Sequence, residues 1–214
     1  MTLDLTRRTT IAGMAAFAAA PALAQSLEEK GYVLGDAPMG DENAPVTMIE
    51  YASLTCPHCA SFHATSWETV KTDYIDTGKV RFIMREVFFD QFGLWATMVA
   101  RSGGEENYHR MIDMYLMRQQ DWYGNHVRAY NQTKNPRPIV DEIMKIGRLS
   151  GMSNQRMTEA LEDRAFLERL VEDYKVYTAE DNVRSTPTFM INGEQATGSM
   201  GPAAISALID AQLS

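Results

Sequence analysis

The chain has 214 residues, a formal net charge of −8 and an apolar content of 45%. This composition is ordinary for a globular protein with a packed core and excludes a largely disordered chain. No cluster of Lys and Arg occurs beyond the first ten residues, so neither nucleic acid nor an anionic membrane surface is expected as a partner.

Residues 1–24 are typical of an export signal. Arg7 and Arg8 form a basic segment, residues 11–20 are a short apolar run, and residues 22–24 are a small-residue cleavage site. The apolar run is shorter than the roughly 20 residues of a membrane span. The paired arginines fit twin-arginine export and general secretory export equally well. We therefore expect a soluble protein in the periplasm once the signal is cleaved.

The next segments predict a strand, a helix and a second strand. Residues 25–45 form a polar N-terminal arm, in which residues 32–34 could pair as an edge strand. Residues 46–51 have the pattern of a buried strand, and residues 80–89 form a second strand rich in Val, Ile and Phe. Between them, a helix begins at Cys56, and its buried stripe repeats at spacings of three and four. The stripe consists of Cys56, Cys59, His63, Trp67, Val70 and Tyr74.

Helical periodicity then dominates, which predicts a helical insertion at about 93–182. Three apolar stripes mark its helices: Tyr108, Met111, Ile112 and Tyr115; Ile139, Ile143 and Ile146; Leu167, Leu170, Val171 and Tyr174. Residues 188–191 and 194–197 flank an Asn-Gly turn and predict a hairpin, and a last helix follows Pro202. This order predicts an α/β domain over residues 46–214, with a mixed β-sheet flanked by helices and the insertion between its βαβ and ββα halves.

The two cysteines of the chain, Cys56 and Cys59, lie three positions apart. A disulfide between them closes a very small loop and removes little entropy from the unfolded chain. In an exported protein, such a pair is better explained by redox chemistry than by structural stapling.

The position of the cysteines at the start of a helix favours that chemistry. Free backbone N–H groups and the positive end of the helix dipole stabilise a thiolate there, so Cys56 is the expected nucleophile. Pro57 suits the first helical turn, and His58 would add a positive charge when protonated. Cys59 lies one turn on, within reach to resolve a mixed disulfide. Stabilising the thiolate stabilises the reduced form, which makes the disulfide form a stronger oxidant.

The sequence Cys56-Pro57-His58-Cys59 after a strand, followed by a helical insertion and the segment Arg184–Phe189, resembles the DsbA family of periplasmic thiol oxidases. The resemblance covers roughly residues 45–213 and implies a thioredoxin-like fold. It also implies that Pro187 lies in cis beside the sulfurs, where Thr186 and Pro187 bind a substrate peptide in strand fashion. The family usually has Val before this proline, and Thr also occurs in isomerase relatives.

Two further residues have candidate roles near the cysteines. Glu50 matches a position where thioredoxin-like proteins commonly carry an acid, and it could accept a proton from Cys59 through water. The alternative is a structural pairing of Glu50 with Arg85. His63 shares the helix face of both cysteines, and we expect a packed residue beside the site because a zinc site usually needs a fourth ligand. No metal or cofactor is expected.

These features favour a monomeric dithiol oxidase that donates disulfides to reduced or unfolded exported proteins. By the resemblance, a membrane partner similar to DsbB and linked to quinone would reoxidise it. Two alternatives stay open: a reductase or isomerase on the same scaffold, and a peptide-binding or chaperone-like module without catalytic activity.

Overall fold

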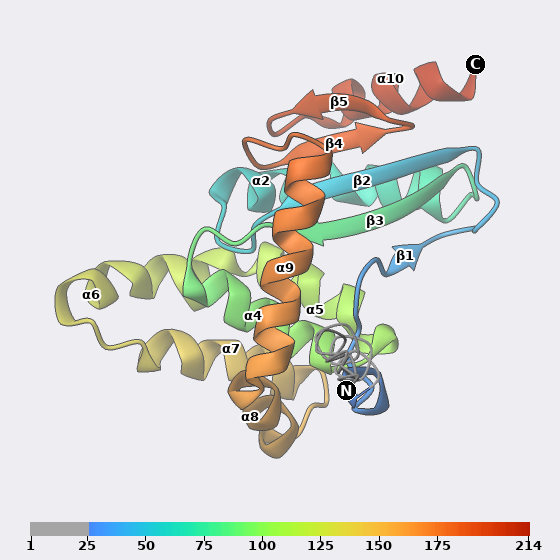
Figure 1. Cartoon of the computed structure of the whole chain (residues 1–214). Coiled ribbons are helices and arrows are strands. Elements are labelled where there is room, and N and C mark those ends of the chain that lie inside the picture. The colour runs from blue at the N-terminus through green and yellow to red at the C-terminus, as the bar shows by residue number, and fades with distance from the viewer. Residues whose placement is uncertain (1–25) are drawn as a thin grey trace, which may run out of the picture.

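The computed structural model describes residues 26–214, so the predicted export signal lies outside the described residues. A mixed sheet forms the centre of the described part (Figure 1). Its strands are β1 (Pro38–Met39), β2 (Val46–Ala52), β3 (Val80–Glu86), β4 (Thr188–Ile191) and β5 (Glu194–Thr197), in the order β1-β3-β2-β4-β5. β2 and β3 are parallel, and the other neighbouring pairs are antiparallel.

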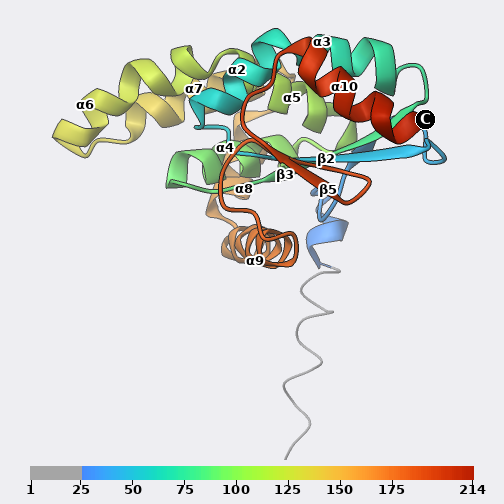
Figure 2. The ribbon, with the colours of Figure 1, turned by 90° about the horizontal axis from the view of Figure 1, so that it is seen from above.

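Helices cover both faces of the sheet (Figure 2). On one face lie α2 (Pro57–Thr65), α3 (Trp67–Val70) and α10 (Pro202–Leu213), and on the other lies α9 (Arg164–Glu180). α10 contacts β2 and β4, whereas α9 contacts β3. The predicted fold class, a mixed β-sheet flanked by helices, is therefore confirmed.

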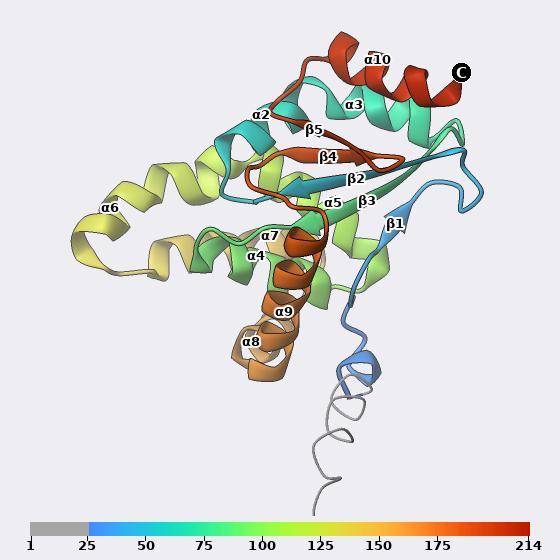
Figure 3. The same ribbon diagram turned by 45° about the horizontal axis from the view of Figure 1, so that its top comes forward.

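The helices between β3 and α9 form a separate layer beside the sheet. They are α4 (Gln91–Ser102), α5 (Glu105–Met117), α6 (Asn125–Thr133), α7 (Arg137–Leu149) and α8 (Asn154–Glu162). α5 packs against α2 and α4, which places this layer next to the cysteines. α6 projects away from the sheet and has no buried residue (Figure 3). The predicted stripes of α5 and α7 are completely buried.

Side chains of β2 point alternately to the two faces of the sheet, and this alternation determines which of them face α2. Val46, Met48 and Glu50 share one face of the strand, and each is fully buried. In the parallel register Met48 lies opposite Phe82, whose ring packs on Trp67 of α3 at 4.6 Å between centroids. The sheet therefore presents the buried carboxylate of Glu50 to a mostly apolar interface with α2 and α3.

The predicted edge strand at Tyr32–Leu34 is wrong, and the edge strand is β1 instead. The backbone of this segment is bonded to a side chain and a helix rather than to a strand. Val33 N–H donates to the Arg101 carbonyl at 2.9 Å, and the Arg101 guanidinium donates to the carbonyls of Val33 and Gly35 at 3.3 and 2.8 Å. Arg101 is itself held by a two-pronged ion pair with Glu86.

The predicted helix from Cys56 is interrupted, and the predicted second strand is shorter. α2 ends at Thr65, and a π-helical turn over Lys71–Ile75 follows α3. Ser66 marks the break, where its hydroxyl donates to the Met200 carbonyl at 2.5 Å. All six residues of the predicted stripe are nevertheless buried. β3 ends at Glu86, three residues before the predicted end. Within residues 26–214, no helix is long and apolar enough to cross a membrane.

Candidate active site

Cys56 lies at the N-cap of α2, as the sequence predicts. Its backbone is extended, with φ −83° and ψ 120°, and Pro57 begins the helix. The Cys56 carbonyl accepts the first helical hydrogen bond, from Ala60 N–H at 3.2 Å, and Cys56 N–H donates to the Ser53 carbonyl at 3.0 Å. This local structure holds the thiol over the free N–H groups of the first turn.

The segment before β4 lies directly beside Cys56. The Thr186–Pro187 peptide bond is cis, and the Cys56 Sγ atom lies 3.5 Å from the Thr186 carbonyl oxygen. Antiparallel pairing of β4 with β2 brings the segment there, because Thr188 lies opposite Tyr51. The structure thus brings Thr186 and Pro187 together with the dithiol across a long stretch of sequence.

The two thiols differ strongly in acidity. The pKa of Cys56 is lowered to about 5, and the largest cause is a hydrogen bond from Cys59. Burial of Cys56 acts in the opposite direction, whereas hydrogen bonds from backbone N–H groups lower the pKa further. The hydrogen bond between the two cysteines raises the pKa of Cys59 well above its usual range, with further increases from burial and from the charge of Glu50. Cys59 is fully buried. At neutral pH the site therefore holds a thiolate at Cys56 and a thiol at Cys59.

Glu50 binds His63, and the alternative pairing with Arg85 is wrong. The Glu50 Oε2 and His63 Nε2 atoms are 3.0 Å apart, and both side chains are buried. Arg85 lies opposite Tyr51 in the register, so it projects from the other face of the sheet. There it donates to the Tyr51 hydroxyl at 2.7 Å and to the carboxylate of Asp36 at 2.8 and 2.9 Å.

His63 is the second titratable group beside the dithiol. Burial lowers its pKa, but the carboxylates of Glu50 and Asp113 outweigh this effect and raise the pKa to about 9. The imidazole stacks on Trp67 with ring centroids 5.0 Å apart. Across residues 26–214, no group of three or more His, Cys, Asp or Glu side chains is arranged to hold a metal ion. His58 differs from His63, because it is exposed on the first turn of α2.

Gln119 is a residue of the site that the sequence analysis missed. It follows α5, and its side-chain amide donates to the carbonyls of Leu54 and Cys56 at 2.8 and 2.9 Å. A lone glutamine in a helical segment carries no signal of such a role, since its partners lie more than sixty positions away in the sequence. Gln119 therefore ties the helical layer to the loop that presents Cys56.

We expect the Gln119→Leu variant of the reduced protein to lose about 1–3 kcal/mol of unfolding free energy, because two buried carbonyls lose a donor. Urea denaturation measures the loss. Gln120→Leu is the matched control, since Gln120 is exposed and its side chain reaches only Asn125. Equal stability of the two variants would contradict the assigned role of Gln119.

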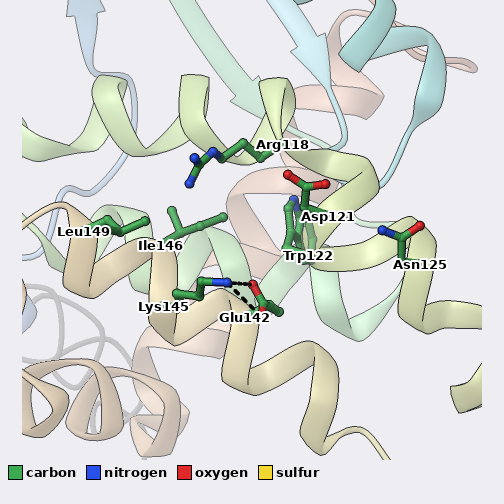
Figure 4. A pocket seen from close by; sticks show the side chains of 8 residues that line it. All are labelled: Arg118, Asp121, Trp122, Asn125, Glu142, Lys145, Ile146 and Leu149. Atoms are coloured by element: carbon green, nitrogen blue, oxygen red, sulfur yellow. Dashed lines mark hydrogen bonds and ion pairs between the residues drawn. The ribbon is translucent and has the colours of Figure 1, made fainter.

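A hollow of about 370 Å³ lies in the helical layer and is separate from the dithiol (Figure 4). Its lining consists of Arg118, Asp121, Trp122, Asn125, Glu142, Lys145, Ile146 and Leu149. Lys145 Nζ binds the Glu142 carboxylate at 2.9 and 3.1 Å, and Arg118 and Asp121 carry opposite charges. The hollow has no net charge to select a ligand, and none of the predicted site residues lines it.

The site holds a thiolate at Cys56 and a thiol at Cys59, at the start of α2 and beside the cis-proline Pro187. This arrangement suits disulfide exchange. The chain is a thiol–disulfide oxidoreductase of the DsbA type, as the sequence resemblance implies. It belongs to the thioredoxin family, whose family model matches residues 33–211.

Named relatives agree with this class. A protein of Rickettsia bellii, named as a protein-disulfide oxidoreductase, is 28% identical over 200 residues, which are 89% of this chain and 73% of the relative. A protein-disulfide oxidoreductase of Rickettsia typhi is 30% identical over 162 residues, which are 75% of this chain and 56% of that relative. The chain thus spans little more than half the length of some relatives.

Solved structures share the fold. Wolbachia pipientis alpha-DsbA1 matches with a TM-score of 0.73 and 26% identity, over 84% of this chain and 92% of that protein. BdbD of Bacillus subtilis, in its oxidised form, matches with a TM-score of 0.70 and 19% identity, over 85% of this chain and 98% of BdbD. The second likeness shows the fold alone.

Proposed function

We propose that the protein is a dithiol oxidase that donates disulfides to exported proteins in the periplasm. The observation that carries this proposal is the split acidity of the pair: the pKa of Cys56 is lowered to about 5 and that of Cys59 is raised. A stable Cys56 thiolate stabilises the reduced form, and the disulfide form then gives up its oxidising equivalents readily.

In the proposed reaction, a substrate thiolate attacks the sulfur of Cys56 in the oxidised protein. The bond to Cys59 breaks, Cys59 takes up a proton, and a mixed disulfide joins Cys56 to the substrate. The second substrate thiolate then attacks the substrate sulfur of that bond, and Cys56 leaves as a thiolate. Two electrons pass to the protein; of the two substrate protons, one stays on Cys59 and one is released.

The remaining predicted residues have supporting roles in the same proposal. Thr186 and Pro187 bind the substrate backbone beside the sulfurs, Pro57 and His58 shape the first turn, and Glu50 exchanges a proton with Cys59. A partner similar to DsbB reoxidises the pair, and the protein acts as a monomer on reduced or unfolded chains. The predicted export signal supports the periplasmic location.

The test is the reduction potential of residues 25–214, measured by equilibration with glutathione buffers and trapping of the thiols. We expect a value near about −120 mV, at the oxidising end of the thioredoxin-like range. A value near about −270 mV, typical of thioredoxin, would overturn the oxidase direction and favour a reductase on this scaffold.

A further inference from the structure

The thiol of Cys59 has no direct access to water. Cys59 is fully buried and belongs to the main hydrophobic core of the described residues. It must nevertheless lose a proton each time it closes the disulfide and regain one each time the disulfide opens. The protein therefore needs a group beside Cys59 that exchanges protons and a route from that group to solvent.

Glu50 has one carboxylate oxygen available for this exchange. Its Oε1 atom is buried and has no hydrogen-bond partner, whereas Oε2 is 3.0 Å from His63 Nε2. A buried oxygen without a donor is costly in a structural residue and is useful in a residue that takes up a proton. The charge of Glu50 is also felt at Cys59.

His63 continues the path toward the surface. Its Nδ1 atom lies 3.6 Å from Asp113 Oδ1, on the side opposite Glu50. The His63 side chain is 1% exposed, whereas that of Asp113 is 34% exposed. The three groups thus lead from the interior of the sheet, through α2, to solvent beside α5.

The surroundings of His63 favour a charged imidazole. The charged groups that face it are Glu50 from β2 and Asp113 from α5. Lys71 and His109 lie near enough to Asp113 to feel its charge. The ring stacks on Trp67 with Nε2 at hydrogen-bond distance from Glu50. Nδ1 is buried without a hydrogen-bond partner, and the nearby Asp113 carboxylate is the acidic group on that side.

We propose that His63 and Asp113 form a proton relay between Glu50 and solvent, which serves the proton exchange of Cys59. This inference deepens the proposed function and rests on it for the role of Cys59. His63 and Asp113 act through Glu50, so they are positioning residues for the reaction.

Closing of the disulfide moves one proton from Cys59 and forms the bond between the two cysteine sulfurs. Cys59 gives its proton to Glu50, and its sulfur attacks the sulfur of Cys56 in a mixed disulfide. The partner thiolate leaves with the electron pair of the broken bond. Neutralising Glu50 removes the charge that holds the His63 proton, and the imidazolium releases its Nδ1 proton past Asp113 to solvent. Opening of the disulfide reverses each transfer.

The test separates the two steps of the reaction with glutathione disulfide. Attack by Cys56 is followed alone in the Cys59→Ser background, and closure by Cys59 is followed as the second phase in the otherwise intact protein. In the His63→Gln variant the side chain still donates to Glu50 but cannot titrate. We expect closure to slow by about 10- to 100-fold, while attack by Cys56 changes by less than about twofold.

The pH profile of closure is a readout that a merely structural role would not move. Closure in the wild-type protein should vary little between about pH 6 and pH 8, because the proton leaves through the relay. In His63→Gln the rate of closure should increase with pH by up to about tenfold per pH unit, since the fraction of Cys59 present as thiolate then depends directly on hydroxide. An unchanged rate and profile in this variant would overturn the relay.

Asp113→Asn tests the relay at a partly exposed position, in case the buried His63→Gln substitution impairs folding. We expect it to slow closure in the same direction by a smaller factor, while the exposed Glu106→Gln, on the same helix and with the same charge change, has no effect. Equal rates for these two variants would remove Asp113 from the relay. All these rates are measurable whichever direction the enzyme runs, so a low reduction potential would reject the oxidase and leave the relay testable.

Discussion

The Cys59→Ser variant should form a lasting mixed disulfide with glutathione, whereas the Cys56→Ser variant should form none. Cys56 carries the lowered pKa and lies at the surface end of the pair, while Cys59 is fully buried and protonated. The nucleophile in disulfide exchange is a thiolate that the partner can reach. Only Cys56 meets both conditions.

Mass spectrometry after incubation with glutathione disulfide measures this difference. The wild-type protein is the control, because its Cys59 should release glutathione and leave the internal disulfide. The Cys56→Ser variant should also lose all catalysis of oxidative refolding of a reduced protein. A glutathione adduct on Cys59 in that variant would show that the buried thiol is reactive, and the assignment of the nucleophile would be wrong.

The reduced protein should gain stability relative to the oxidised protein as the pH rises from about 5 to 9. In the folded reduced state the pKa of Cys56 is about 5, against an ordinary value of 9.0. A group with a depressed pKa stabilises the fold above its unfolded pKa and loses that effect as the pH falls through its folded pKa. The oxidised protein has no such thiol, so other titrating groups largely cancel in the comparison.

The size of this change in unfolding free energy follows from the shift in the Cys56 pKa. Each pKa unit corresponds to about 1.4 kcal/mol, and solvent at the mouth of the site screens part of it, so we expect a total change of about 2–4 kcal/mol. The raised pKa of Cys59 acts in the opposite sense but only above about pH 9, outside this window. Urea denaturation of both forms at several pH values measures the difference.

A matched variant shows whether the thiolate is responsible. In Cys56→Ser the dependence of stability on pH should follow that of the oxidised protein between about pH 5 and 9, because the titrating group is gone. If the reduced and oxidised wild-type proteins instead keep a constant difference in stability across this range, Cys56 has an ordinary pKa and the case for a strong oxidant fails.

Local patterns were sufficient to predict the elements that carry the dithiol. The apolar run of β2, the Asn-Gly hairpin of β4 and β5, and the helix after Pro202 all occur where their residues predict them. The position of Cys56 at a helix start follows from the proline after it. These features depend on neighbours in sequence, which a single sequence displays.

The partners of the buried polar groups could not be predicted in the same way. Periodicity shows that Glu50 and His63 face inward, but not that α5 packs on α2 and brings Asp113 and Gln119 to the site. Whether Glu50 meets Arg85 depends on which face of β3 carries Arg85, and the unbroken apolar run Phe82-Ile83-Met84 before it does not show this. β1 has only two residues and contains a proline, so its pattern is too short to recognise.

The distance along the chain between Cys56 and Thr186 has a consequence for biosynthesis. The two residues meet in the folded site but are 130 positions apart. A ribosome that adds about 5–20 residues per second completes the thiols roughly 6–26 seconds before it reaches Thr186. During that interval β2 lacks β4 as a neighbour, and one of its edges is open to pairing with other chains. The length of the helical layer thus sets how long each new chain has both cysteines but lacks β4, the strand that covers this edge of β2.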